Sequence, residues 1–112
     1  MHGQIVSKLK PGSAVDFEGM LGVVTGGGTG MGRALCEALA SEGCHIALCD
    51  VDMVAAAETQ ALCVAVRFAG TTITIHPCEV SSEESVESFR DAVVSARCNA
   101  ACINLLFNNA GI

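Results

Sequence analysis

Short apolar runs alternate along the chain with longer segments in which apolar residues recur every three or four positions. The short runs are residues 20–24, 45–49, 71–76 and 103–107. Runs of this length predict strands buried on both faces of a sheet. The longer segments predict helices over 30–42, 53–68 and 81–96. Regular alternation of strand and helix predicts an α/β fold with a doubly wound parallel sheet and right-handed crossovers.

Three local signals support the ends of the predicted helices. Gly43 follows Glu42 where a left-handed cap would end the first helix. Gly70 stops the second helix, ahead of the β-branched run that forms the third strand. Ser81 and Glu84 match a capping box that would begin the third helix.

The first sixteen residues show no apolar periodicity and contain turn formers such as Pro11 and Gly12. We expect residues 1–16 to form a flexible tail and residues 17–112 to form one domain. The sequence contains no apolar stretch of the length of a membrane span. The tail also lacks the apolar core of a signal peptide, so we expect a cytoplasmic or organellar-matrix protein.

The composition narrows the classes of partner. Apolar residues make up 51% of the chain and charged residues 16%, as expected of a buried core. Twelve acidic residues against six basic ones give a net charge of -6. Because no cluster of Lys and Arg is present, we expect no nucleic-acid partner.

The seven cysteines do not suggest a disulfide framework, because their number is odd and most lie within apolar runs. Buried thiols in a reducing compartment are the favoured interpretation. There is no Cys-x-x-Cys motif, and the histidines show no ligand spacing, so we expect no metal site. The cysteines are Cys36, Cys44, Cys49, Cys63, Cys78, Cys98 and Cys102.

A glycine-rich segment, residues 25–32, joins the first predicted strand to the first predicted helix. A pyrophosphate at such a position needs a tight turn, a bare backbone that phosphate oxygens can approach, and a helix N-terminus. Gly26, Gly30 and Gly32 meet these needs in this order. A kinase-type phosphate loop would require Gly-Lys-Ser/Thr, whereas Gly32 is followed by Arg33 and Ala34.

Asp50 ends the second apolar run, about 20 residues beyond the glycines, where an acidic side chain can bind the adenosine ribose. Its alternative role is to cap the following helix. A carboxylate at this position also repels a 2′-phosphate, and residues 48–55 contain no Arg or Lys. The sequence therefore favours NAD over NADP as cofactor.

Together with Asn108-Asn109-Ala110-Gly111, the glycine motif and Asp50 resemble the short-chain dehydrogenase/reductase family over residues 17–112. The resemblance implies a Rossmann-type sheet of strand order 3-2-1-4-5-6-7, of which this chain would supply 3-2-1-4, truncated after strand four. It also implies hydride transfer between a nicotinamide cofactor and an alcohol or carbonyl compound. A full-length parent would be a homo-oligomer.

The resemblance further implies which residues contact the cofactor. The glycine segment would hold the pyrophosphate, Asp50 the ribose, residues 79–80 the adenine and residues 109–111 the nicotinamide half. Glu79 departs from the Asp that is usual in the family. The implied cofactor-binding residues are Thr25, Gly26, Gly28, Thr29, Gly30, Met31, Gly32, Asp50, Glu79, Val80, Asn109, Ala110 and Gly111.

No catalytic residue is assigned, because the family's Ser and Tyr-x-x-x-Lys follow strand four and this chain contains no Tyr. We therefore expect no turnover by the 112-residue chain alone. The open edge of strand four predicts marginal stability and association. Two alternatives stay open: a non-catalytic nucleotide-binding or interaction fragment, and a methyltransferase-like binder of S-adenosylmethionine.

Overall fold

A computed structural model describes residues 16–96 and 103–109 of the chain. Almost all of the predicted tail lies outside these residues, as do Ala110 and Gly111. The elements are β1 (Leu21–Thr25), α2 (Gly30–Ser41), β2 (His45–Asp50), α3 (Met53–Val66), β3 (Ile73–Pro77), α4 (Glu83–Ala96) and β4 (Leu105–Asn108). None of the described helices has the length and apolar character needed to cross a membrane.

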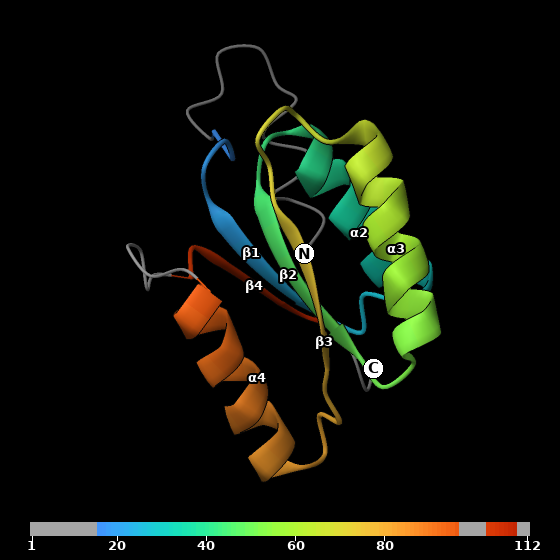
Figure 1. Cartoon of the computed structure of the whole chain (residues 1–112), viewed down its shortest axis with the longest axis vertical. Coiled ribbons are helices and arrows are strands. Elements are labelled where there is room, and N and C mark those ends of the chain that lie inside the picture. The colour runs from blue at the N-terminus through green and yellow to red at the C-terminus, as the bar shows by residue number, and fades with distance from the viewer. Residues whose placement is uncertain (1–15, 97–102, 110–112) are drawn as a thin grey trace.

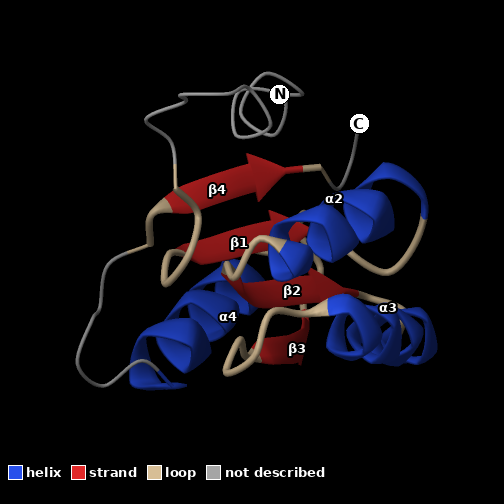
Figure 2. Cartoon of the chain, turned by 90° about the horizontal axis from the view of Figure 1, so that it is seen from above, coloured by secondary structure: helices blue, strands red, loops and turns tan. Residues whose placement is uncertain are grey.

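The four strands form one parallel sheet in the order β3-β2-β1-β4 (Figure 1). Val23 in β1 lies between Ala47 of β2 and Leu106 of β4 in the register. Helices α2 and α3 cover one face of the sheet and α4 lies on the other (Figure 2). This architecture confirms the predicted Rossmann-type fold and strand order.

Alternating side chains of each strand build two separate cores. Val24 and Leu48 belong to the cluster beneath α2 and α3, whereas Val23 and Ala47 belong to the cluster beneath α4. Successive side chains of a strand point to opposite faces, so a strand with helices on both sides must be apolar throughout. This is why the strands appear in the sequence as continuous apolar runs.

The described cysteines lie in these cores as buried thiols, as predicted. Burial raises the pKa of the Cys49 thiol to about 12 and that of Cys63 to about 11. Both thiols are therefore protonated at neutral pH and behave as small apolar groups. The buried cysteines are Cys36, Cys44, Cys49, Cys63 and Cys78, while Cys98 and Cys102 lie outside the described residues.

The start of α4 differs from the prediction. Ser82, rather than Ser81, accepts a hydrogen bond at its Oγ from the Ser85 N–H, at 3.2 Å. The Glu79 carbonyl accepts from the Ser82 N–H at 2.9 Å, which closes a turn just before the helix. This turn places Ser82 one residue before the first helical position, so the predicted capping box of Ser81 and Glu84 is wrong.

Helix α3, predicted over residues 53–68, is shorter than its apolar pattern predicts. It ends at Val66, because Arg67 has the extended dihedral angles φ -66° and ψ 149°. Phe68 then accepts from the Thr71 N–H at 3.1 Å, closing a turn that contains Gly70 at φ +86°. The sequence pattern extends the predicted helix through residues 67–68. The turn that begins at Phe68 instead ends α3 at Val66.

Candidate functional site

The glycine-rich segment forms the loop between the end of β1 and the start of α2. Gly26 and Gly30 have φ values of +67° and +59°. Glycine adopts such positive values readily because it carries no Cβ. Thr29 is the N-cap residue of α2 but makes no side-chain hydrogen bond to the first turn, which also holds no acidic residue. The N–H groups and dipole of this helix end can therefore receive an anion.

Gly32 is buried where α2 passes over the loop. A Cβ at this position would overlap the carbonyl oxygen of Gly26 and lie 2.9 Å from Nδ2 of Asn109. Glycine is therefore required here by close packing of helix, loop and β4, whereas Gly30 has no heavy atom within 4 Å of its Cβ position. The three glycines serve different purposes: Gly26 and Gly30 adopt positive φ values, and Gly32 allows the close packing.

Asp50, at the end of β2, turns its carboxylate toward the glycine loop. Oδ2 accepts from the Gly28 N–H at 2.9 Å and Oδ1 accepts from the Asp52 N–H at 3.0 Å. A carboxylate can accept about four hydrogen bonds, so each oxygen retains capacity for a further donor such as a hydroxyl. A Cβ on Gly28 would lie 2.6 Å from Oδ2, which explains the absence of a side chain there.

The neighbouring Asp52, not Asp50, caps α3. Its Oδ1 accepts from the N–H groups of Val54 at 3.1 Å and Ala55 at 3.0 Å. The alternative role for Asp50, as the cap of the following helix, is therefore wrong. Its carboxylate instead links the glycine loop to the end of β2.

The end of β4 is tied to the same loop. The Thr25 hydroxyl lies 3.1 Å from Oδ1 of Asn108 and accepts from the Asn109 N–H at 2.9 Å. The side-chain amide of Asn109 donates to the Gly26 carbonyl at 3.2 Å. Asn109 therefore meets Thr25 and Gly26, more than 80 residues away in the sequence, at the carboxyl edge of the sheet.

Glu79 and Val80 follow β3 and reach the same edge, because the Cys78 N–H donates to the Asp50 carbonyl at 3.3 Å. Glu79 is exposed, and its carboxylate accepts from the Ser81 N–H at 3.3 Å. Val80 is half-buried against the core beneath α4. Their position suits contact with a ligand lying along this edge.

Two residues that support the loop were not predicted from the sequence. Thr59, fully buried on α3, has its hydroxyl 2.8 Å from the Gly27 carbonyl oxygen. Arg33 donates from Nε to this hydroxyl at 2.9 Å and from Nη2 to Glu58 at 3.0 Å. The signal for Thr59 in the sequence is a hydroxyl on the inward face of a helix. The other buried residues of this helix are Ala55, Ala56 and Cys63.

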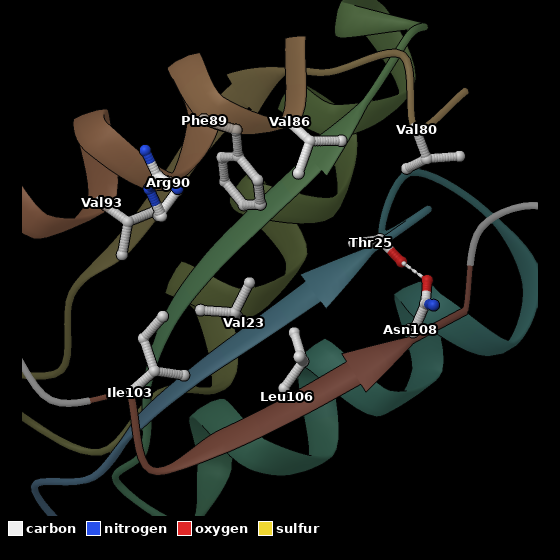
Figure 3. Close-up of a pocket in the computed structure, with 10 residues that line it drawn as sticks. All are labelled: Val23, Thr25, Val80, Val86, Phe89, Arg90, Val93, Ile103, Leu106 and Asn108. Carbon is white, nitrogen blue, oxygen red and sulfur yellow. Dashed lines mark hydrogen bonds between the residues drawn. The ribbon is translucent and has the colours of Figure 1, made fainter. Parts of the chain in front are cut away.

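A second feature lies on the opposite face of the sheet, between α4 and the strands β1 and β4. Here an apolar hollow of about 410 Å³ is lined by side chains such as Val23, Phe89 and Leu106 (Figure 3). Thr25 and Asn108 lie at its end nearest the glycine loop. Its walls carry few polar groups, so the hollow is suited to apolar side chains rather than to a phosphate.

A metal is not indicated within residues 16–96 and 103–109, where no group of three or more His, Cys, Asp or Glu side chains could hold an ion. The site consists instead of backbone N–H groups, one carboxylate and side-chain amides at the carboxyl edge of a parallel sheet. In open α/β sheets, ligands bind at this edge where the strand order reverses. Here the reversal falls between β1 and β4, beside the glycine loop.

The family profile of short chain dehydrogenases matches residues 21–112, which include all seven elements. The chain belongs to the short-chain dehydrogenase/reductase family. An uncharacterized oxidoreductase of Bacillus subtilis, YxbG, is 35% identical over 96 residues, which cover 86% of this chain and 33% of that protein.

Solved structures of this oxidoreductase family share the fold. A Burkholderia phymatum enzyme in complex with NAD superposes with a TM-score of 0.76 and is 38% identical, over 88% of this chain and 33% of that one. A metagenomic enzyme in complex with NADP has the same TM-score and is 28% identical, over 88% and 42%. The chain spans about a third of the length of the first curated relatives it matches.

Proposed function

We propose that this chain is the nicotinamide dinucleotide-binding portion of a short-chain dehydrogenase/reductase, formed by residues 17–112. The pyrophosphate would lie over the glycine loop at the N-terminus of α2, and the adenosine ribose would donate hydroxyl hydrogens to Asp50. Glu79 and Val80 would contact the adenine, and residues 109–111 the nicotinamide half. The main observation in support is the position of the Asp50 carboxylate, which the N–H groups of Gly28 and Asp52 hold beside the loop.

We further propose that NAD is preferred over NADP. A 2′-phosphate beside Asp50 would place two negative charges together, which is unfavourable unless a cation intervenes. The guanidinium of Arg33, the cation that directly follows the glycines, is bonded to Thr59, Glu58 and the Ala55 carbonyl. Solved structures of the family hold either cofactor, so the proposed preference rests on Asp50 and on the engaged guanidinium of Arg33.

Titration of the chain with NADH and NADPH, followed by nicotinamide fluorescence, tests the preference. We expect tighter binding of NADH, and we expect Asp50→Ala to narrow the gap because it removes both the ribose acceptor and the repulsion. Asp52→Ala is the matched control: it removes the cap of α3, costing about 1 kcal/mol of stability, but should keep the preference. Equal affinities in the unmutated chain would contradict the proposal.

The reaction of a longer parent would be hydride transfer between a nicotinamide and a small alcohol or carbonyl compound. A bound nicotinamide supplies the hydride chemistry, while the protein supplies position and a proton donor of suitable pKa at the carbonyl oxygen. The Tyr that the family uses for this proton is not among the 112 residues. We therefore propose that the chain binds cofactor without turnover, in the cytoplasm or an organellar matrix, and that a full-length parent is a homo-oligomer.

Incubation of the pure chain with NAD and a panel of alcohols tests this second point. No substrate-dependent rise in NADH absorbance is expected, and such a rise would contradict it. S-adenosylmethionine should not compete with NADH. Failure of any nucleotide to bind to the folded chain would favour the remaining alternative, a non-catalytic interaction fragment.

A further inference from the structure

The side chain of Arg33 connects α2 to α3 directly behind the glycine loop. Arg33 lies in the first turn of α2, and its side chain is only 26% exposed. Nε donates to the Thr59 hydroxyl at 2.9 Å, while Nη2 donates to the Ala55 carbonyl at 3.2 Å and to Glu58 at 3.0 Å. Because a guanidinium is planar and rigid, contact with three acceptors fixes its orientation.

The Thr59 hydroxyl passes this orientation on to the loop. A hydroxyl has one hydrogen and two lone pairs, whereas a guanidinium can only donate. Since Arg33 occupies one lone pair of the hydroxyl, the single hydrogen is directed to the other side. There the hydroxyl donates to two successive carbonyl oxygens, those of Gly27 at 2.8 Å and Gly28 at 3.1 Å. Thr59 is fully buried, so bulk water does not compete for these bonds.

Both carbonyl groups therefore face α3 rather than the open side of the loop. In a planar trans peptide the C=O and N–H groups point in opposite directions. The N–H that follows the Gly27 carbonyl is that of Gly28, which donates to Asp50 at 2.9 Å. The N–H that follows the Gly28 carbonyl is that of Thr29, which has no hydrogen-bond partner among the described residues. An anion above the loop would meet this N–H group rather than the two carbonyl oxygens.

We propose that Arg33 is a positioning residue for the pyrophosphate and that it acts through the Thr59 hydroxyl. This inference rests on the dinucleotide site proposed above and gives a role in it to a side chain bonded behind the loop. By directing the hydroxyl hydrogen to Gly27 and Gly28, Arg33 keeps two carbonyl oxygens away from the negative charge. It thereby leaves the outward N–H groups of the loop to bind the phosphate oxygens.

Direct attraction between Arg33 and the phosphates is the competing explanation. The guanidinium is paired with the Glu58 carboxylate at 3.0 Å, so the two opposite charges largely cancel at a distance. Its bonds to Thr59 and Ala55 also direct it toward α3. The two explanations differ in one respect: only positioning through the hydroxyl requires Thr59.

The binding of ADP and of adenosine to the full chain tests the proposal. ADP carries the pyrophosphate, whereas adenosine offers only the adenine and the ribose. Arg33→Met should weaken ADP binding at least about tenfold, because it removes the orientation of the loop toward an anion. Adenosine binding, measured by NMR titration, should weaken less than about twofold. A general disruption of the site would instead weaken both ligands alike.

Arg90→Met is the matched control for the lost charge. Arg90 is also paired with a carboxylate, that of Asp91 at 3.1 Å, but lies on α4. This variant removes the same positive charge and should bind ADP like the unmutated chain. Circular dichroism checks that each variant is folded. If Arg33→Met does not fold, Arg33→Lys repeats the test, because one ammonium group cannot replace Nε and Nη2 together.

A double-mutant cycle tests whether Arg33 acts through Thr59. In the Thr59→Val background the hydroxyl is already absent, so Arg33→Met should weaken ADP binding no further. A further loss of about tenfold in that background would indicate direct attraction and overturn the proposal. Unchanged ADP binding in Arg33→Met, or equal losses for ADP and adenosine, would also overturn it. If the unmutated chain does not bind ADP, the proposed dinucleotide site itself is wrong, and the unmutated chain thus distinguishes the two failures.

Discussion

The two faces of the sheet are built from the same strands but are covered to different extents. On one face α2 and α3 bury a continuous core, in which Leu48 and Val24 are inaccessible to solvent. On the other, α4 covers a smaller core and leaves the hollow beside β4, where Leu106 is 66% exposed. The candidate cofactor site belongs to the well-covered side, because its loop rests on Leu48, Thr59 and Ala55.

The closer packing lies beneath the glycine loop, where a rigid backbone is needed. The approach of Gly27 and Gly28 to Leu48, Ala55 and Asp50 is so close that a Cβ on either glycine would lie within 3 Å of them. Such packing holds the backbone N–H groups of the loop in place, as a preorganised ligand site requires. The face beneath α4 is instead open next to β4, where the apolar hollow lies.

The largest expected effect on stability comes from replacing one leucine by alanine on each face of the sheet. Leu48→Ala, on the covered face, should lower the free energy of unfolding by about 2–5 kcal/mol, because it leaves a cavity under the loop. Leu106→Ala, on the open face, should change it by no more than about 0.5 kcal/mol. Urea unfolding followed by circular dichroism measures both, since the chain has no Trp or Tyr. Equal losses would show that the two faces are equally packed.

Removing the hydrogen bonds beneath the glycine loop should lower the stability by a smaller amount. Thr59→Val keeps the shape but removes the hydroxyl shared by Arg33 and the carbonyls of Gly27 and Gly28, so these polar groups lose a partner. We expect a loss of about 1–3 kcal/mol together with weaker binding of NADH. Thr59→Ser, which restores the hydroxyl, should recover most of both. If Thr59→Val binds NADH normally, the loop does not depend on this contact.

The smallest effect is a pH dependence on the α4 side. Burial lowers the pKa of His76. The centroid of its ring lies 5.1 Å from the centroid of the Phe89 ring. The unfolded chain therefore binds a proton more readily than the folded one, and stability should fall as the pH drops below the ordinary histidine value of about 6.5. His76→Phe should show a flatter profile of thermal midpoint between about pH 7.5 and 5.5. Parallel profiles for the two proteins would contradict this assignment.

Much of the fold follows from the sequence because its signals are local. The apolar runs define four strands, the three-to-four periodicity defines three helices, and Gly43 ends α2 at φ +84° as its position predicts. The resemblance carried by the glycine motif, Asp50 and Asn109 predicted the strand order. Local patterns were less reliable at helix ends, where Ser82 replaced Ser81 as the cap and α3 stopped at Val66.

The sequence by itself thus determined the elements, the family and the candidate residues, since strand and helix periodicities and a motif of fixed spacing are properties of short segments. The tertiary structure alone decided which partners these residues have. It showed that Asp52 rather than Asp50 caps α3, and that Thr59, more than 25 residues away in the sequence, supports the glycine loop and is held by Arg33. Such contacts depend on how the helices pack on the sheet, and packing depends on side chains that are distant in the sequence.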